Sequence, residues 1–372
     1  MAQIRQEITV AGTGGILGSI AQLDTTQYSG TVTYYFEAVM SGQGIGGDVV
    51  LRRFGTTTDD ATITYLAADV NKRRRSSSFT PPAGQTQYII AIPTGSGALK
   101  AGRIIIIQNG SPITSTETQI EIGSREVSRT NTASTPLTYP QYWLYTAANW
   151  SGTKVFYGET TYSVATSKLT CTIKLQEDDG SFGSWADKVT IVNAGNSTAY
   201  ARIRATFTPT DGRHYRLVTS SSSSKSAHTV NNARIIVDQT NSPTQFELQY
   251  LMLNSVDNNL AQDQGYDTLF DANEWSGVTN FYYHAHDASN SADSSRLKEE
   301  GNGYLANSTV TGANQQISAA IVLNDDTEID TNVITSTGNI AASRILVKVS
   351  PLWPTPPVNQ PLSTSFPSNV SV

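Results

Sequence analysis

The sequence predicts an all-β protein made of three tandem antiparallel β-sandwiches of jelly-roll-like topology, followed by an extended proline-rich tail. First, an aromatic residue, a Ser-Gly pair and a β-rich run occur together three times, with the pairs at 29–30, 151–152 and 276–277. Second, 47 Thr and 40 Ser, roughly a quarter of the 372 residues, favour strands and turns. Third, no stretch keeps an apolar period of about 3.6 residues over three helical turns.

The spacing of the Ser-Gly pairs defines the repeat. It is 122 and then 125 residues, which is the length of a whole domain and not of a solenoid unit. A small residue and an arginine also precede an aliphatic run three times, at Gly102-Arg103, Ala233-Arg234 and Ser343-Arg344. Residues 118–122 and 244–248 match as well. We therefore predict β-sandwich repeats at 1–113, 114–243 and 244–350, which would form an elongated rod or plate if packed in a row.

The individual strands follow from alternating or continuous apolar runs punctuated by Gly and Pro. The glycine-rich opening, residues 1–27, is expected to be loop and strand, because it fits neither a dinucleotide-binding nor a Walker motif. The tail, 351–372, is expected to be an extended polyproline-like arm that docks through Trp353 and Phe366. The expected strands are 31–39, 48–53, 61–65, 87–92 and 103–108; 154–162, 169–176, 188–192, 199–207, 215–219 and 233–239; and 278–286, 296–298, 308–311, 316–322 and 343–349.

Several side chains have expected places in the core. Alternation puts Cys171 on an apolar face, which predicts a buried, inert thiol. Trp150 and Trp275 hold the same repeat position and are expected to be core plugs, whereas the unmatched Trp185 is the better surface candidate for stacking on a sugar. Aliphatic residues of the closing strands, Ile105, Ile236 and Leu346 or their immediate neighbours, are expected to be buried.

Four polar segments raise chemical alternatives. The basic run 72–75 suggests a localisation or phosphate-binding patch, and a solvated strand face is the favoured interpretation. His284, His286 and Asp287 are spaced like metal ligands on a strand, yet a polar strand face is favoured because no third ligand is evident. The acidic segments 177–180 and 324–326 lack the spacing of a dedicated calcium loop and are expected to be exposed turns.

No nucleophile elbow, catalytic triad or selectable carboxylate pair occurs. We therefore assign no catalytic, cofactor-binding or metal-binding residue, and expect a protein that is not an enzyme and needs no cofactor. The net charge of −6 argues against a general nucleic-acid binder. No apolar run reaches membrane-spanning length, and the first residues lack the layout of a signal peptide, so we expect neither membrane insertion nor a classical export signal.

Through its repeated W-S-G…Y-F and A-R-I-I-V segments, the chain resembles jelly-roll modules of phage virion proteins and bacterial surface proteins, and also carbohydrate-binding modules. The resemblance covers most of residues 28–349; it implies a β-sandwich scaffold and transfers no functional residue. The expected function is a non-enzymatic structural protein of a larger particle: a virion decoration, fibre or tail component, or a surface filament subunit. Its expected partners are further copies of the chain or other structural proteins of a virion or extracellular surface assembly. The alternative is a glycan-binding protein for attachment to a host or surface.

Overall fold

The structure is a computed structural model that describes most of the first two thirds of the chain and the strands of the last third. The described residues are 2–7, 12–13, 15–41, 45–69, 72–94, 98–109, 113–123, 127–137, 142–241, 246–249, 263–270, 278–287, 294–299, 302–311, 314–324, 327–333 and 340–350.

Each third of the chain builds two antiparallel sheets, which we call its 1-8-3-6 sheet and its 2-7-4-5 sheet from the order of their strands along that third. In the first third the 1-8-3-6 sheet runs β1 (Ala2–Glu7), β9 (Ala98–Asn109), β4 (Thr31–Ser41) and β7 (Lys72–Arg75), with β2 (Gly12–Thr13) also paired to β9. Its 2-7-4-5 sheet runs β3 (Gly15–Asp24), β8 (Gln85–Thr94), β5 (Gly47–Arg53) and β6 (Asp59–Tyr65).

The second third repeats this arrangement. Its 1-8-3-6 sheet runs β10 (Ser115–Gly123), β19 (His228–Thr240), β14 (Thr153–Val164) and β17 (Ala201–Phe207), with β11 (Val127–Arg129) also beside β19. Its 2-7-4-5 sheet runs β12 (Thr135–Pro136), β18 (His214–Ser221), β15 (Cys171–Asp178) and β16 (Trp185–Gly195), with β13 (Trp143–Leu144) also beside β18.

The last third has the same order. Its 1-8-3-6 sheet runs β20 (Phe246–Gln249), β28 (Ile340–Ser350), β22 (Val278–Asp287) and β26 (Asn314–Ile321). Its 2-7-4-5 sheet runs β21 (Asp263–Phe270), β27 (Thr327–Val333), β23 (Ser294–Glu299) and β24 (Gly303–Tyr304), with β25 (Val310–Thr311) also beside β23. The helical elements of the described residues are two three-residue 3₁₀ helices, η1 (Thr25–Gln27) and η2 (Ala147–Asn149).

Strand orders 1-8-3-6 and 2-7-4-5 are those of a jelly roll, in which two sheets share interleaved Greek-key connections. The all-β sandwich class predicted from the sequence is therefore confirmed, and the preferred topology is supported. Strand pairing stays within 2–109, 115–240 and 246–350. The boundaries near 113 and 243 stay predictions, because pairing alone does not say whether each third folds on its own.

The repeated Ser-Gly pair has a steric cause at the start of β4 and β14. Gly30 and Gly152 have φ angles of +83° and +69°, a region that side chains rarely tolerate. A Cβ atom at either position would lie 2.3 Å from the carbonyl oxygen of the last residue of β9 or β19. The serine carbonyl before each glycine accepts a hydrogen bond from Gln108 or Gln239, at 3.0 Å in both cases. The motif is thus a structural junction between strands three and eight.

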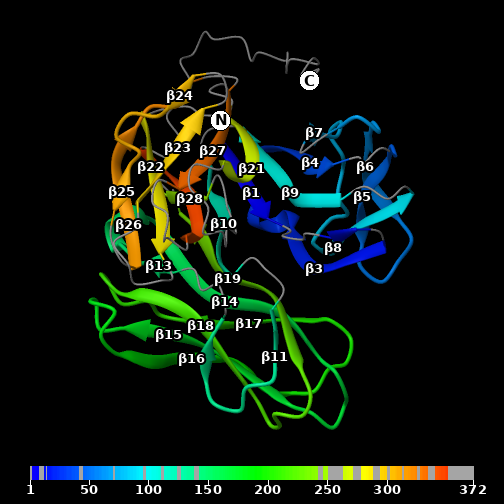
Figure 1. Ribbon diagram of the computed structural model, residues 1–372, viewed down its shortest axis with the longest axis vertical. Helices are drawn as coiled ribbons and strands as arrows, with labels where there is room; N and C mark the ends of the chain where they lie inside the picture. The colour runs from blue at the N-terminus through cyan, green and yellow to red at the C-terminus, as the bar shows by residue number, and fades with distance from the viewer. Residues whose placement is uncertain are drawn as a thin grey trace.

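The three sandwiches are grouped around a common centre, as Figure 1 shows, with the first third in blue, the second in green and the last in yellow to orange. The first strands of the three thirds, β1, β10 and β20, contact one another there. The expected packing in a row is therefore wrong. The reason is that a sheet has two faces, and the outer faces of the 1-8-3-6 sheets in the first two thirds carry side chains that are also buried.

Alternation along β9 separates those two faces. Ile104 and Ile106 point into the sandwich, whereas Ile105 and Ile107 join Tyr35 in a second buried cluster on the outer face. The predicted burial of Ile105 and Ile236 is confirmed, since both are fully buried. The side chain of Leu346 lies outside the described residues, and its neighbour Ile345 is buried.

The predicted core plugs can be checked in the second third. Trp150 is 3 % exposed and packs edge-on against Trp143 and Phe156, with ring centroids 6.4 and 6.3 Å away. Cys171 is buried as expected, and burial raises the pKa of its thiol to about 12. Trp275 and Trp353 lie outside the described residues. The predicted burial of Trp150 and Cys171 is therefore confirmed.

Candidate interface and surface pocket

A buried charged surface covers the outer face of the β10-β19-β14-β17 sheet. Strand alternation gathers its side chains on one side of the sheet, and most of them are shielded from water although they are charged or amide-bearing. We call this surface the inner polar face. It consists of Glu117, Gln119, Glu121, Glu159, Arg202, Arg204, Asn232, Arg234 and Asp238.

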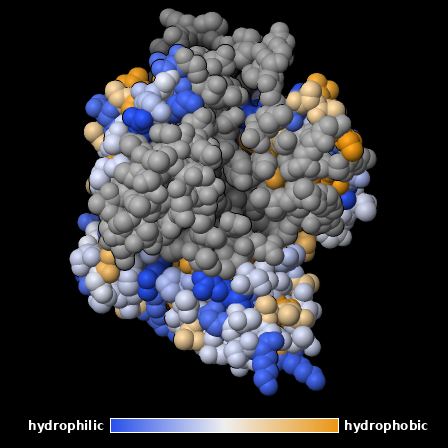
Figure 2. Space-filling view, viewed as in Figure 1, coloured by the Kyte–Doolittle hydropathy of each residue, from blue (hydrophilic) through white to orange (hydrophobic). Residues whose placement is uncertain are grey.

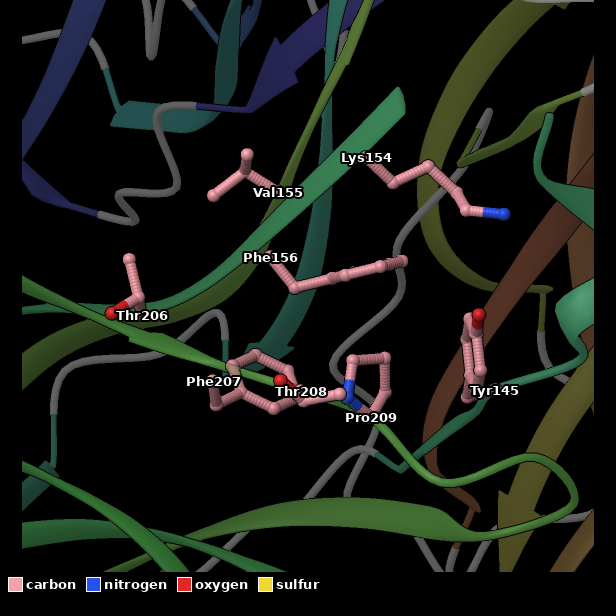
Figure 3. Close-up of a pocket in the computed structure, with 8 residues that line it drawn as sticks. All are labelled: Tyr145, Lys154, Val155, Phe156, Thr206, Phe207, Thr208 and Pro209. Carbon is pink, nitrogen blue, oxygen red and sulfur yellow. The ribbon is translucent and has the colours of Figure 1, made fainter. Parts of the chain in front are cut away.

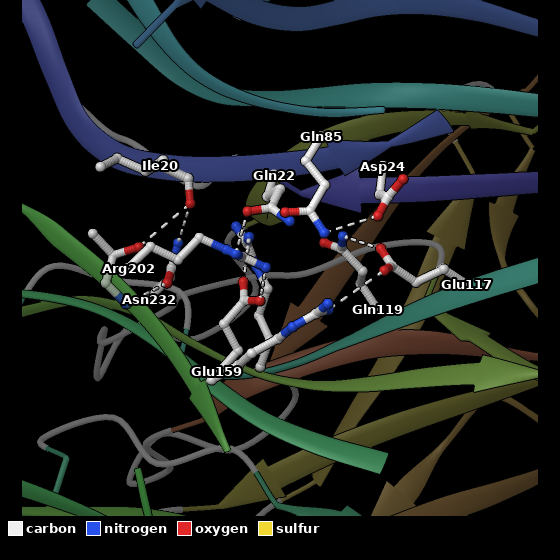
Figure 4. Close-up of polar contacts among 12 residues, drawn as sticks. Ile20, Gln22, Asp24, Gln85, Glu117, Gln119, Glu159, Arg202 and Asn232 are labelled. Atoms are coloured by element: carbon white, nitrogen blue, oxygen red, sulfur yellow. Dashed lines mark hydrogen bonds and ion pairs between the residues drawn. The ribbon is translucent and has the colours of Figure 1, made fainter. Parts of the chain in front are cut away.

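Strand β3 of the first third lies against this inner polar face, as Figure 4 shows. The Arg202 guanidinium donates to Oε1 of Gln22 at 2.5 Å. The Asn232 amide and the Thr161 hydroxyl donate to the backbone carbonyl of Ile20 at 3.3 and 3.4 Å. The contact between the first two thirds is therefore polar and directional, and it satisfies one backbone carbonyl of β3.

Ion pairs within the inner polar face neutralise its charges. Arg202 pairs with Glu159, and Nε of Arg234 lies 2.5 Å from Oε1 of Glu121. Nη1 of Arg234 also lies 3.7 Å from Oε1 of Glu159. Since the side chains of Glu159 and Arg234 have no exposed area, removing either one would leave its partner charged in a dry environment. Such a loss typically costs about 3–5 kcal/mol.

The repeated arginine lies inside each closing strand and faces a carboxylate in the first two thirds. Arg234 lies directly across from Glu159, and Arg103 directly across from Glu37, in equivalent strands of the first two thirds. In the last third, His284 stands opposite Arg344. The sequence analysis identified the arginines but missed their acidic partners. Glu37 and Glu159 could have been found, because each lies eight residues after the serine of a Ser-Gly pair.

The basic run 72–75 belongs to the same kind of network. Nη1 of Arg73 lies 2.5 Å from the buried carboxylate of Glu37, Nη2 of Arg75 lies 3.1 Å from it, and Nη1 of Arg103 lies 3.4 Å from it. Arg73 is 7 % exposed. The predicted solvated face is therefore wrong for Arg73. The carboxylate that binds this run is 36 residues away in the chain, so the local pattern does not reveal the partner.

One pair in the inner polar face joins two acids. Glu117 of β10 and Asp238 of β19 lie directly opposite each other in the sheet. Burial, and then the nearby charge of Asp238, raises the pKa of Glu117 to about 8, and burial also raises the pKa of Asp238. Gln119 donates to Oε1 of Glu117 at 3.0 Å, and Nη1 of Arg204 lies 3.9 Å from Oε2. Burial and the neighbouring carboxylate therefore favour the protonated form of this pair.

The carboxylates of the acidic segment 177–180 accept hydrogen bonds from neighbouring backbone groups. Asp179 is exposed, and its carboxylate accepts hydrogen bonds from the backbone N–H groups of Ser181 and Ser184, each at 3.0 Å. Asp178 accepts from the backbone N–H of His214 at 2.7 Å. The exposed-turn prediction is confirmed for Asp179 and Gly180, but it is wrong for Glu177 and Asp178, which end strand β15 and are half-buried and buried. Asp325 and Asp326 of the other acidic segment lie outside the described residues.

The His284 strand gives no ligand set in the part of the chain that can be examined. His284 is 3 % exposed, so it does not lie on an open polar strand face. The side chains of His286 and Asp287 lie outside the described residues. Among the side chains that the structure describes, no group of three or more His, Cys, Asp or Glu is placed to hold a metal ion.

The surface candidate Trp185 is half-buried in an aromatic and cationic cluster. The guanidinium carbon of Arg216 lies 4.0 Å from the centre of its ring, and Tyr142 is stacked against it at 5.4 Å. Phe182 packs beside it at 6.1 Å. Because protein groups already use the ring surface, Trp185 is not an open platform for a sugar.

A surface pocket of about 490 Å³ lies at one end of the second sandwich (Figure 3). Strands β14 and β17 pair as far as Phe156 and Phe207, and beyond that pair the two chains diverge. The cavity opens between them. Its lining combines aromatic rings, threonine side chains and one lysine: Tyr145, Lys154, Val155, Phe156, Thr206, Phe207, Thr208 and Pro209.

The described exterior is mainly polar. On the face drawn in Figure 2, the lower lobe, built by the second third, shows mostly hydrophilic or intermediate residues with scattered apolar ones. No helix among the described residues is long and apolar enough to cross a membrane.

No family model and no curated protein matches this chain. It is similar to a solved archaeal virus structure described as a triple jelly roll fold and turret assembly, with 13 % identity, a TM-score of 0.22, and coverage of 93 % of this chain and 89 % of the other. It is similar to the VP2 subviral particle of infectious bursal disease virus, with 8 % identity, a TM-score of 0.25, and coverage of 94 % and 79 %. It is also similar to a tandem of two CBM22 modules from Paenibacillus barcinonensis, with 9 % identity, a TM-score of 0.21, and coverage of 63 % and 92 %.

Proposed function

We propose that this chain is a non-enzymatic structural protein that assembles, with copies of itself or with other structural proteins, into a larger particle. The particle is a virion, in which the chain would be a decoration, fibre or tail component, or a surface filament. The observation that carries the proposal is the grouping of three jelly rolls around a common centre, with charged faces buried between them.

The physical argument is one of rigidity. Glu37 and Glu159 have no exposed side-chain area, and each is held by at least two arginines. A buried ion network of this kind is costly to open, because each separated charge would lie in a medium of low polarity. Its carboxylates are therefore used to hold strands and thirds together, and are not presented to a substrate. A rigid multi-sandwich block suits a building unit.

The test measures the size of the purified full-length protein at several concentrations by light scattering, and images the particles by electron microscopy. We expect discrete, regular assemblies, either alone or after addition of extract from the same source. A protein that stays monomeric up to millimolar concentration, and that joins no particle in its source, would overturn the proposal.

A second candidate function is glycan binding for attachment, and the observation that favours it is the pocket in the second sandwich. Aromatic rings and hydroxyl groups around a cavity of about 490 Å³ suit a sugar ring, which has both C–H faces and hydroxyls. A glycan array probed with the labelled full-length chain tests this function. If the labelled chain bound no glycan on the array, the glycan-binding function would be rejected.

A further inference from the structure

The pocket in the second sandwich has a counterpart position in the first that carries a different side chain. Phe79, Thr80 and Pro81 of the first third occur as Phe207, Thr208 and Pro209 in the second. Phe79 bridges to Tyr34 in the same way as Phe207 pairs with Phe156. The frame of the pocket is therefore a repeated feature of the fold.

The two sites differ in charge at one position. Val32 lies opposite Gln108 in the first third, and Lys154 lies opposite Gln239 in the second, at the same place in the sheet. Val32 packs against the apolar core. The equivalent position of the last third is Thr279, opposite Val349. The second third thus places an ammonium group where the other two thirds have an uncharged side chain.

The ammonium group of Lys154 has capacity left for a ligand. Its Nζ donates to the backbone carbonyl of Trp150 at 2.9 Å, and among the described residues no carboxylate pairs with it. Two other lysines of this third are ion-paired: Nζ of Lys174 lies 2.6 Å from Asp187, and Nζ of Lys188 lies 2.9 Å from Glu177. An ammonium has three donors, so Lys154 can still bind an anion.

The rest of the lining indicates what carries that anion. The half-buried ring of Phe207 and the exposed side chain of Val155 give the lining apolar surface, which packs well against the C–H groups of a pyranose. Thr206 and Thr208 are exposed, and their hydroxyls can exchange hydrogen bonds with those of a sugar. An acidic peptide would match the charge but would leave this mixture of ring faces and hydroxyls unused.

We infer that the pocket between β14 and β17 binds a carboxylated sugar, with its carboxylate on Lys154 and its ring against Phe207 and Val155. This inference deepens the second function proposed above and does not depend on assembly. Lys154 supplies selectivity for the acid over the neutral sugar. Phe207 and Val155 supply the apolar contact that both sugars share.

The experiment uses the full-length chain and compares methyl β-D-glucuronide with methyl β-D-glucoside by ligand-observed saturation-transfer NMR and titration calorimetry. We expect the glucuronide to bind at least about fivefold more tightly, the size of effect that one partly exposed charge pair contributes. Lys154→Val, which introduces the residue of the first third, should remove that preference while the protein still unfolds at the wild-type temperature. Lys154→Gln, which keeps a polar side chain, should do the same. Lys225→Ala, at an exposed lysine in another loop, should keep the preference.

Three results would overturn the inference: no binding of the glucuronide at 20 mM, an approximate limit for weak sugar sites; equal binding of both sugars; or an unchanged preference in both Lys154 variants. A di-glutamate peptide that binds more tightly than the glucuronide would also overturn it, in favour of an acidic peptide. The size of the particles is measured on the same samples. Intact assembly without sugar binding rejects this inference alone, and sugar binding without assembly rejects the structural function alone.

Discussion

The acid pair at the centre of the molecule predicts an unusual dependence of stability on pH. Glu117 is 3 % exposed, lies opposite Asp238, and has a pKa raised to about 8 by burial and by that neighbour. The folded state therefore holds a proton that the unfolded chain, with an ordinary pKa of 4.5, has already released. A group with a raised pKa in the folded state contributes stability that is complete below pH 4.5 and is lost as the pH rises through 8.

The size of the effect follows from the same shift. One unit of pKa corresponds to about 1.4 kcal/mol, so the loss between pH 5 and 9 is of the order of 2–5 kcal/mol. The charged and titratable neighbours that face the pair are Glu159, Arg202, Arg204 and Asp24. Arg202 and Arg204 lower the pKa values of the pair, whereas Glu159 and Asp24 raise them. Because the arginines offset part of the rise in pKa, the range of the expected loss in stability begins at about 2 kcal/mol.

Replacing Glu117 by glutamine tests the reasoning. Glutamine keeps the shape and a hydrogen-bond donor but cannot ionise, so the variant should lose most of the decline in unfolding free energy between pH 5.5 and 8.5. Urea unfolding at each pH, followed by near-ultraviolet circular dichroism, measures it. Asp187→Asn is the control, because hydrogen bonds from Lys174 and Gln176 lower the pKa of Asp187 and keep it ionised throughout. A Glu117→Gln variant with the wild-type pH slope would refute the argument.

Three further predictions concern the backbone, the closing strands and the tail. Gly152→Ala should destabilise the protein by several kcal/mol, whereas Gly212→Ala, at φ +73° in open space, should cost only about 1–2 kcal/mol in thermal or urea unfolding; equal costs would contradict the steric account of the Ser-Gly pair. Ile236→Ala should cost about 2–5 kcal/mol although its side chain points away from the sandwich interior; an unchanged melting temperature would show that the outer face is not packed. Deleting 351–372 should leave melting unchanged and abolish assembly in light scattering; a truncated chain that assembles to the same size would rule out a docking arm.

The strands and the fold class could be predicted because they depend on local pattern. Period-two alternation located β5, β6 and β15 within a few residues, and the repeated Ser-Gly and Arg-aliphatic segments aligned the same strands in each third. Short or irregular strands were harder. The four-residue strand β7 consists of a lysine and three arginines, so nothing in its own composition indicates a strand.

The inner polar face could not be predicted, because alternation tells which residues share a face but not whether that face is covered. Glu159 and Arg234 are 75 positions apart, and their burial depends on β3, which is more than 130 residues away from Glu159 in the chain. The pocket escaped notice for a related reason. Its lining joins 145–156 with 206–209, and the only local sign was the repeated Phe-Thr-Pro.

Burial, more than distance, decides what the ion pairs of this chain contribute. Nη1 of Arg73 lies 2.5 Å from Glu37 with side chains 6 % and 0 % exposed, and Nε of Arg52 lies 2.6 Å from Asp59 with side chains 19 % and 27 % exposed. Glu37→Gln would remove the buried negative charge that Arg73, Arg75 and Arg103 share, so we expect a loss of about 3–5 kcal/mol in urea unfolding. Asp59→Asn removes an equally short but accessible pair and should cost less than about 1 kcal/mol. Similar losses in the two variants would mean that water reaches Glu37, and the rigid centre on which the proposed building-block function depends would then have to be given up.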